Sequence, residues 1–216
     1  MAVRHVLLAA VAALGLAGCT SAVAGQAAPA VHPVLRFRPV LVDPSSGSPM
    51  ILPVTPSSAG AVADPNQAKA IRQNPAVASD SNAQQLAFAA LDCAKPDPLH
   101  AADDPAKPLV TCDKDGQNKY ILGPSFLDGT AIQSASASYD QQQAQWFVQL
   151  TFKPDAARTW ADYTGKNVGQ QAAFLLDGQV QSAPTINQQI TGNTTEISGS
   201  FTAQTARDLA AALNTH

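Results

Sequence analysis

The sequence has few of the residues on which most enzyme chemistry depends. Of its 216 residues only 13% are charged and 6% are aromatic, and the net charge is −3. The thirteen Lys and Arg form no cluster, which argues against a nucleic-acid-binding surface. The four histidines lie near the chain ends or in proline-rich stretches and leave little material for acid–base catalysis or a histidine metal site: His5, His32, His100 and His216.

No set of residues resembles a catalytic centre. Three serines have no histidine close to them in the sequence and no nucleophile-elbow motif, which argues against a serine hydrolase: Ser125, Ser182 and Ser198. Four aspartates lack the ordered oxygen pattern and terminal Glu of calcium loops, so we expect them in a solvated acidic loop: Asp103, Asp104, Asp113 and Asp115. The sequence therefore predicts a protein that is not an enzyme and needs no cofactor or metal.

A hydrophobic run long enough to cross a membrane is also lacking. Residues 1–18 have the pattern of a secretory signal peptide, with a basic start at Arg4. The apolar run over residues 6–17 spans about 18 Å as a helix, too short for a bilayer core of about 30 Å. Its end, Leu16-Ala17-Gly18-Cys19, resembles a bacterial lipobox, which implies cleavage before Cys19 and diacylation of its sulfur.

Two interpretations of this leader remain open. In the first, the protein is a lipoprotein of the extracytoplasmic side, and the acyl chains on Cys19 anchor it to the cell membrane. In the second, an ordinary signal peptide is removed and Cys19 is incidental.

Lipidation of Cys19 leaves one pair of cysteines, Cys93 and Cys112. Their spacing is not C-x-x-C, which disfavours a thioredoxin-type redox site. A metal site would need more ligands than two thiols and the distant His100 supply. In an oxidising compartment we therefore expect a disulfide that closes a loop of about 20 residues and stabilises the fold by roughly 3 kcal/mol.

The N-terminal half of the mature chain shows little periodic pattern. Pro39 places the first alternating stretch at a sheet edge, and short helices are expected at most near residues 67–73 and 84–91. The expected segments are a flexible tether at 19–33, an edge strand at 34–42, a low-complexity, largely disordered insert at 43–85 and a disulfide-closed loop region at 86–118.

From residue 119 onward the pattern sharpens. Residues 132–139 and 145–152 predict a β-hairpin, and Asp177-Gly178 predicts the turn of a second one. Pro154 opens a helix, and Thr202 caps a last helix with apolar residues at helical spacing.

These elements predict an α+β domain over residues 119–216. One antiparallel sheet carries helices packed on one face, behind disordered N-terminal segments. Trp146 and Trp160 fall in apolar stripes and are expected in the core.

The same region resembles the first periplasmic, or head, domain of the SecD/SecDF protein-export family. The ordered set of motifs covers about a hundred residues and is more specific than any single motif. It comprises Tyr120-Ile-Leu-Gly-Pro, Asp128-Gly-Thr-Ala-Ile, Gln145-Trp-Phe-Val-Gln-Leu-Thr-Phe, Phe174-Leu-Leu-Asp-Gly-Gln-Val-Gln-Ser-Ala-Pro-Thr-Ile and Glu196-Ile-Ser-Gly-Ser-Phe, with Phe37-Arg-Pro-Val and Asp103-Asp-Pro-Ala-Lys-Pro-Leu-Val-Thr-Cys-Asp upstream.

The resemblance implies a binding module, here as a stand-alone lipoprotein without the transmembrane bundle of SecD. Its implied partners are exported polypeptides or components of the Sec translocase, and exposed edge strands can bind extended chains by strand addition. The alternative is a structural or interaction lipoprotein of the cell envelope with no export role. The sequence does not separate the two hypotheses, because both need only the fold and an anchor.

Overall fold

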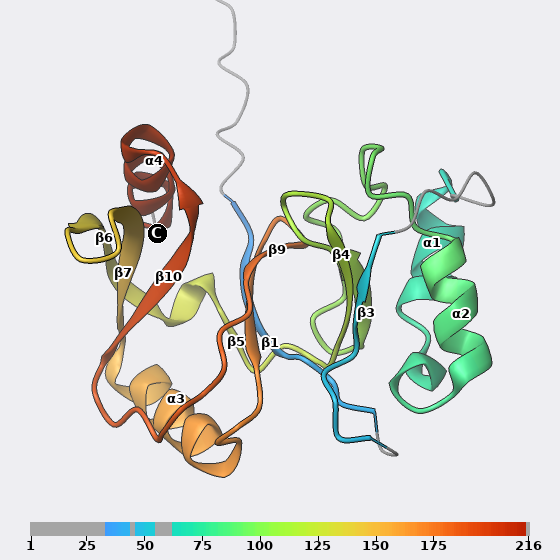
Figure 1. The fold of residues 1–216 in the computed structure, drawn as a ribbon, viewed down its shortest axis with the longest axis horizontal. Helices are drawn as coiled ribbons and strands as arrows, with labels where there is room; N and C mark the ends of the chain where they lie inside the picture. Colours follow the sequence, from blue (N-terminus) through green and yellow to red (C-terminus); the bar gives the residue numbers. More distant parts are fainter. Residues whose placement is uncertain (1–32, 44–45, 55–61, 215–216) are drawn as a thin grey trace, which may run out of the picture. The chain divides into compact units, whose positions relative to one another are not determined.

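The computed structural model describes residues 33–43, 46–54 and 62–214 (Figure 1). These residues all fall within one compact unit. The predicted signal peptide, residues 19–32 of the predicted tether and Cys19 lie outside the described residues. Among the helices of the described ranges, none is long and apolar enough to span a bilayer.

The described strands form three antiparallel sheets rather than one. Their orders are β5-β1-β8-β9, β10-β7-β6 and β2-β4-β3, which we call the first, second and third sheet. The strands are β1 Leu35–Pro39, β2 Ile51–Pro53, β3 Leu109–Cys112, β4 Asn118–Leu122, β5 Leu127–Asp128, β6 Ile132–Asp140, β7 Gln145–Phe152, β8 Ala172–Leu176, β9 Gln179–Ser182 and β10 Thr194–Phe201.

The α+β class is confirmed, but the prediction of a single sheet within residues 119–216 is wrong. β1, β2 and β3 lie before residue 118 and pair with strands that begin at residue 118 or later. Single bridges from Val40 to Leu122 and from Asp113 to Val180 join the first and third sheets. Alternating apolar residues identify a buried face, but they do not say which strand lies alongside.

The local elements after residue 119 are confirmed. β6 pairs with β7, and β8 turns into β9 through Asp177 and Gly178, whose φ angles are 51° and 86°. Positive φ at both central residues is what a two-residue hairpin turn of this kind requires. The helices are α3 Pro154–Lys166 and α4 Ala203–Leu213, and Thr202 caps α4 in a capping box with Thr205.

The prediction that the first strand lies at a sheet edge is wrong. β1 lies between β5 and β8, with Phe37 opposite Leu127 on one side and Phe174 on the other. Pro39 fits there because β5 is only two residues long and its pairing ends at Phe37. On that side Pro39 only accepts a hydrogen bond, from the N–H of Gly123, so its missing N–H leaves no ladder bond unmade.

The described part of residues 43–85 is ordered, which differs from the expected disorder. Beyond β2, it contains α1 Pro65–Arg72, the 3-10 helix η1 Pro75–Ala78 and the start of α2 Ser81–Ala89. Asp64, Asn74 and Asp80 each cap the N-terminus of one of these helices through a side-chain oxygen. Small apolar side chains, such as Val77 and Ala87, pack against β3 and β4, so the segment needs few large residues to be held.

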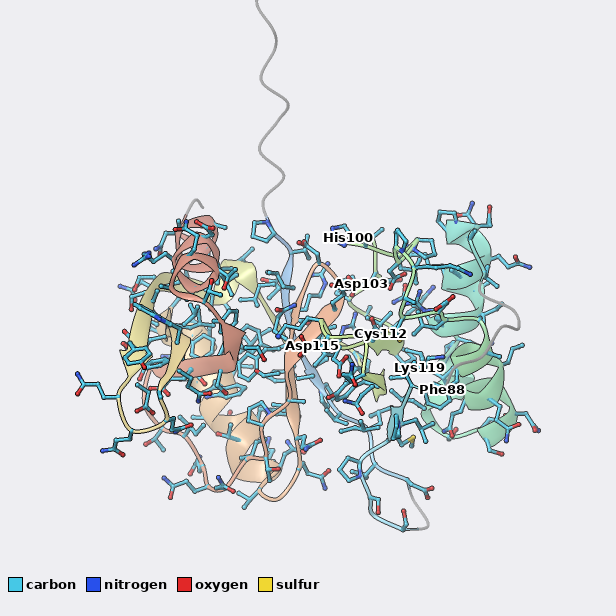
Figure 2. The ribbon with its side chains drawn as sticks, turned by 45° about the horizontal axis from the view of Figure 1, so that its top comes forward. Phe88, His100, Asp103, Cys112, Asp115 and Lys119 are labelled. Carbon is cyan, nitrogen blue, oxygen red and sulfur yellow. A yellow bond between two sulfur atoms is a disulfide. The ribbon has the colours of Figure 1, made fainter. Side chains whose placement is uncertain are left out.

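Two contacts besides packing hold these helices. Arg72 is buried, donates to both carboxylate oxygens of Asp97 at 2.6 and 2.7 Å, and donates to the carbonyl of Val110. Lys119 donates to the carbonyls of Phe88 and Leu91 at the C-terminal end of α2 (Figure 2). The predicted loop region 86–118 thus also contains the end of α2 and all of β3.

Asp103 is buried and not solvated, so the acidic-loop prediction is wrong at this position. Its carboxylate pairs with the guanidinium of Arg38, which is fully buried in β1 and also donates to the carbonyls of Lys107 and Gly123. Burial lowers the pKa of Arg38, although its contact with Asp103 opposes that shift. The pair fixes part of the loop between Cys93 and Cys112 against the first sheet.

An aromatic cluster forms the centre of the main core. The Phe37 ring lies 5.1 Å from that of Phe174 and 5.9 Å from that of Trp160, measured between centroids. Trp160 is 2% exposed, which confirms its predicted place in the core. Burial raises the pKa of Tyr163, which stacks on Phe126, to about 12. The second sheet and α4 share this core, and Figure 1 shows α4 beside β6, β7 and β10.

Candidate functional site

The second sheet has two outer strands, β10 and β6, and their hydrogen-bonding direction follows from one contact. The peptide N–H and C=O of Ala135 in β6 bond to the side chain of Asn214, so they point away from β7. Ala135 lies opposite Leu150, and Leu150 lies opposite Thr195. In an antiparallel ladder the direction of the peptide groups alternates from one residue to the next along each strand. Leu150 and Thr195 therefore bond to each other, and the peptide groups of the residues before and after Thr195 in β10 point outward.

The outward peptide groups of β10 belong to Thr194, Glu196 and Ser198. Within the described residues, their N–H and C=O groups have no hydrogen-bond partner. An unpaired row of this kind is what an extended chain needs for pairing. β10 is therefore a candidate site for strand addition.

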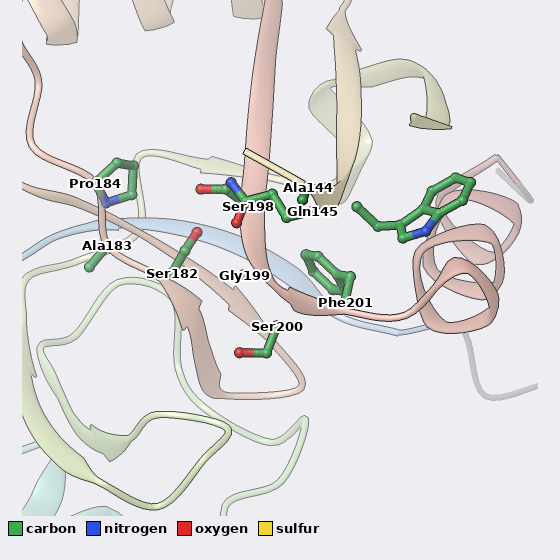
Figure 3. A pocket seen from close by; sticks show the side chains of 10 residues that line it. Ala144, Gln145, Ser182, Ala183, Pro184, Ser198, Gly199, Ser200 and Phe201 are labelled. Carbon is green, nitrogen blue, oxygen red and sulfur yellow. The ribbon is translucent and has the colours of Figure 1, made fainter. Parts of the chain in front are cut away.

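A hollow of about 570 Å³ lies beside the end of β10 (Figure 3). In this view Ser182, Ala183 and Pro184 stand on one side and Phe201 on the other, with Ser198 and Gly199 between them. The rest of the lining is Ala144, Gln145, Trp146 and Ser200. The hollow thus lies where the end of β9 meets the end of β10.

A second hollow, of about 330 Å³, lies farther along β10 at Thr195 and Glu196. The buried ring of Trp160 lines it, together with Ile186 and Ile190. Pro184 lines both hollows. We call the two hollows, with the outer edge of β10 that borders them, the β10 groove.

The end of β10 departs from regular pairing. The register with β7 shifts between Ser198 and Phe201, so Gly199 and Ser200 form an irregularity in the strand. A Cβ atom on Gly199 would lie 3.3 Å from the carbonyl oxygen of Gln181, closer than most such contacts. A glycine therefore lets β10 approach β9 here, and bulges of this kind end pairing and redirect side chains.

The lining of the β10 groove suits main-chain binding more than chemistry. Glu196 is its only charged lining residue. The hydroxyl of Ser182 is buried without a hydrogen-bond partner in the described part of the chain. Ser125 does not line the groove, and its hydroxyl donates to the carbonyl of Leu127. Within the described ranges no group of three or more His, Cys, Asp or Glu is placed to hold a metal ion.

Of the predicted site residues, Cys93 and Cys112 do not line this groove. Cys93 and Cys112 are joined by a disulfide, with their Cα atoms 5.8 Å apart (Figure 2 labels Cys112). Cys19 lies outside the described residues. The exposed edge of β10 could not be predicted from the sequence, because the alternation of residues does not show on which side a neighbouring strand is missing.

Comparison with known proteins matches this region to one family. Residues 107–215 match the family described as SecDF, P1 head subdomain. The chain is 48% identical to the protein translocase subunit SecD of Mycobacterium tuberculosis over 128 residues, which cover 58% of the chain and 22% of that relative. It is 39% identical to the same subunit of Streptomyces coelicolor over 138 residues, 58% of the chain and 24% of that relative.

The chain therefore spans about a fifth to a quarter of the length of these relatives. A solved structure of SecDF, described as a membrane component that enhances protein export, aligns with 85% of the chain and 62% of its own length. The sequence identity is 26% and the TM-score is 0.46.

Proposed function

Because the chain belongs to the SecDF P1 head subdomain family, whose matched relatives are protein translocase subunits, we propose that it takes part in protein export by binding extended segments of exported polypeptide in the β10 groove. The observation that supports this most is the outer edge of β10. Its peptide groups at Thr194, Glu196 and Ser198 have no partner in the described part of the chain, and hollows border the strand.

Strand addition explains how such a site binds many sequences. Main-chain hydrogen bonds supply affinity whatever the side chains are, and shallow pockets add a modest preference. Ordering a flexible chain offsets much of this gain, so we expect a dissociation constant in the micromolar range or weaker, about −8 kcal/mol or less in magnitude. With only Glu196 charged in the lining, binding should change little with salt.

Binding and release are the only steps in this proposal. No bond is made or broken, and the protein acts without enzymatic chemistry. Lipidation at Cys19 would keep the groove close to the membrane, on the extracytoplasmic side where exported chains emerge, within reach of the Sec translocase. The Cys93–Cys112 disulfide suits the same compartment.

A titration tests the proposal. The full-length protein is mixed with a fluorescently labelled, reduced and alkylated secretory protein that cannot fold, at low and at high salt. Glu196→Pro removes one outward N–H from the edge strand without touching the ladder to β7, so we expect binding to weaken about tenfold or more. Glu196→Gln keeps the N–H and should bind like the parent protein.

A second control lies on the opposite edge of the same sheet. Ala137→Pro removes an outward N–H from β6 and should leave binding in the β10 groove unchanged. Absence of binding at high micromolar concentration, at both salt concentrations, would contradict the proposal and favour a structural lipoprotein of the envelope.

A further inference from the structure

The outer edge of β6 is closed by a single side chain. The carboxamide of Asn214, just after α4, accepts the N–H of Ala135 and donates to its C=O, and both bonds measure 2.8 Å. An exchange of two N–H···O bonds with one residue is what a neighbouring antiparallel strand would provide. Asn214 thus occupies the place of one residue of an added strand.

Apart from Asn214, the middle of this edge lacks the usual protection of outer strands, while an irregularity between Ile132 and Ser134 and the charged Asp140 lie at its two ends. Exposed edges are commonly guarded by charged side chains, proline or bulges. Residues 132–139 contain no charged residue and no proline, and the side chains after Gln133 are Ser and Ala up to Tyr139. The peptide groups of Ala137 and Tyr139 have the same outward direction as those of Ala135, and within the described residues they have no partner.

The strand is also complementary to itself. If two β6 strands pair in antiparallel fashion around Ala137, each Ala135 lies opposite Tyr139 of the other copy, and all paired residues point their peptide groups at each other. Tyr139 is 48% exposed, so its side chain is accessible at the end of the strand. We propose that the outer edge of β6 is a pairing surface for a second copy of this chain, and that Asn214 keeps it closed.

Counting hydrogen bonds explains why the closed form is favoured. Pairing around Ala137 forms six backbone bonds between the copies, but the two Asn214 side chains must first give up four bonds that they already make. While Asn214 is present, association therefore adds few hydrogen bonds overall. Without its carboxamide, all six bonds favour association. The inference concerns the edge opposite the β10 groove and does not depend on polypeptide binding there.

The test is the oligomeric state of the full-length Asn214→Ala variant. Sedimentation velocity over a range of concentrations should show a monomeric parent protein and a variant that dimerises, with self-association about tenfold tighter or more. Hydrogen exchange should show the Ala135 amide protected in the parent. The Ala137 amide should become protected only in the variant, because pairing to a second copy covers it.

Two further variants separate pairing from loss of structure. In Asn214→Ala/Ala137→Pro the edge cannot donate at the centre of the pair, so the protein should return to the monomer. Asn167→Ala makes the same change at the C-terminal end of α3, where Asn167 donates to the carbonyl of Tyr163, and should stay monomeric. An Asn214→Ala variant that stays monomeric, or one that associates even with Ala137→Pro, would overturn the inference.

Discussion

At the scale of single residues, two buried arginine–aspartate pairs organise the part of the chain with the fewest large apolar residues. Arg72 ties α1 to Asp97, and Arg38 ties β1 to Asp103. Neither pair is recognisable in the sequence, because the partners are separated by 25 and 65 residues. Removing one member of such a pair leaves the other buried without a counter-charge, which is strongly destabilising.

The Arg72–Asp97 pair gives a prediction with a defined pH dependence. Burial alone would raise the pKa of Asp97, but the hydrogen bonds and positive charge of Arg72 hold it below the ordinary value of 3.8. A lowered carboxyl pKa means that its stabilisation is complete above pH 3.8 and is lost as the pH falls through the folded-state value.

We therefore expect Asp97→Asn to lower the free energy of unfolding by about 3 kcal/mol at neutral pH. The difference from the parent protein should shrink as the pH falls below 3.8. Urea titrations at several pH values measure both. Asp115→Asn is the control, since that side chain is 56% exposed and should change stability by about 0.5 kcal/mol or less. Equal effects of the two substitutions would refute the role given to Asp97.

At the scale of elements, the sequence predicts what its own periodicity encodes. The β6–β7 hairpin, the turn at Asp177-Gly178 and the capped helix α4 are local patterns, and all three are confirmed. The three-sheet arrangement depends on β1 and β3 inserting beside later strands, and no local pattern carries that information. The same limit applies to the candidate site. The edge of β10 is free because no other strand pairs with it in the described residues, and no local pattern in the sequence shows this.

The helices α1 and α2 show a different limit. Low-complexity composition predicted disorder, because a segment with few large apolar residues buries too little surface to offset its ordering entropy. Here Ala68, Val77 and Ala87 are each fully buried against a surface that the rest of the domain supplies. Long-range contacts, including the ion pair of Arg72 with Asp97, add stability that the few large apolar residues of this segment do not supply.

Limited proteolysis tests the order of this segment. In the oxidised protein we expect α1 and α2 to resist cleavage almost as well as β6 and β7. Reduction of the Cys93–Cys112 disulfide should lower the stability of the fold by roughly 3 kcal/mol and speed cleavage within residues 65–89 first, because that disulfide lies where α2 joins β3. Rapid cleavage of these helices in the oxidised protein would restore the expectation of a disordered insert.

At the scale of the whole molecule, the proposed anchor and the proposed groove together define a membrane-tethered binding module. Replacing Cys19→Ser should move the protein from the membrane fraction to the soluble one, because acylation of the sulfur is then impossible. Fractionation of cells that express each form measures this, with the parent protein as reference. A variant that still sediments with membranes would contradict lipidation at Cys19.

The most direct test of polypeptide binding is site-specific photo-cross-linking during export. A photoreactive amino acid is placed at Ser200 in the lining of the β10 groove or at Gln133 on β6, both of which are exposed. We predict adducts with exported polypeptide from position 200 and few from position 133. No adducts at position 200, or equal labelling from both positions, would contradict binding in the β10 groove.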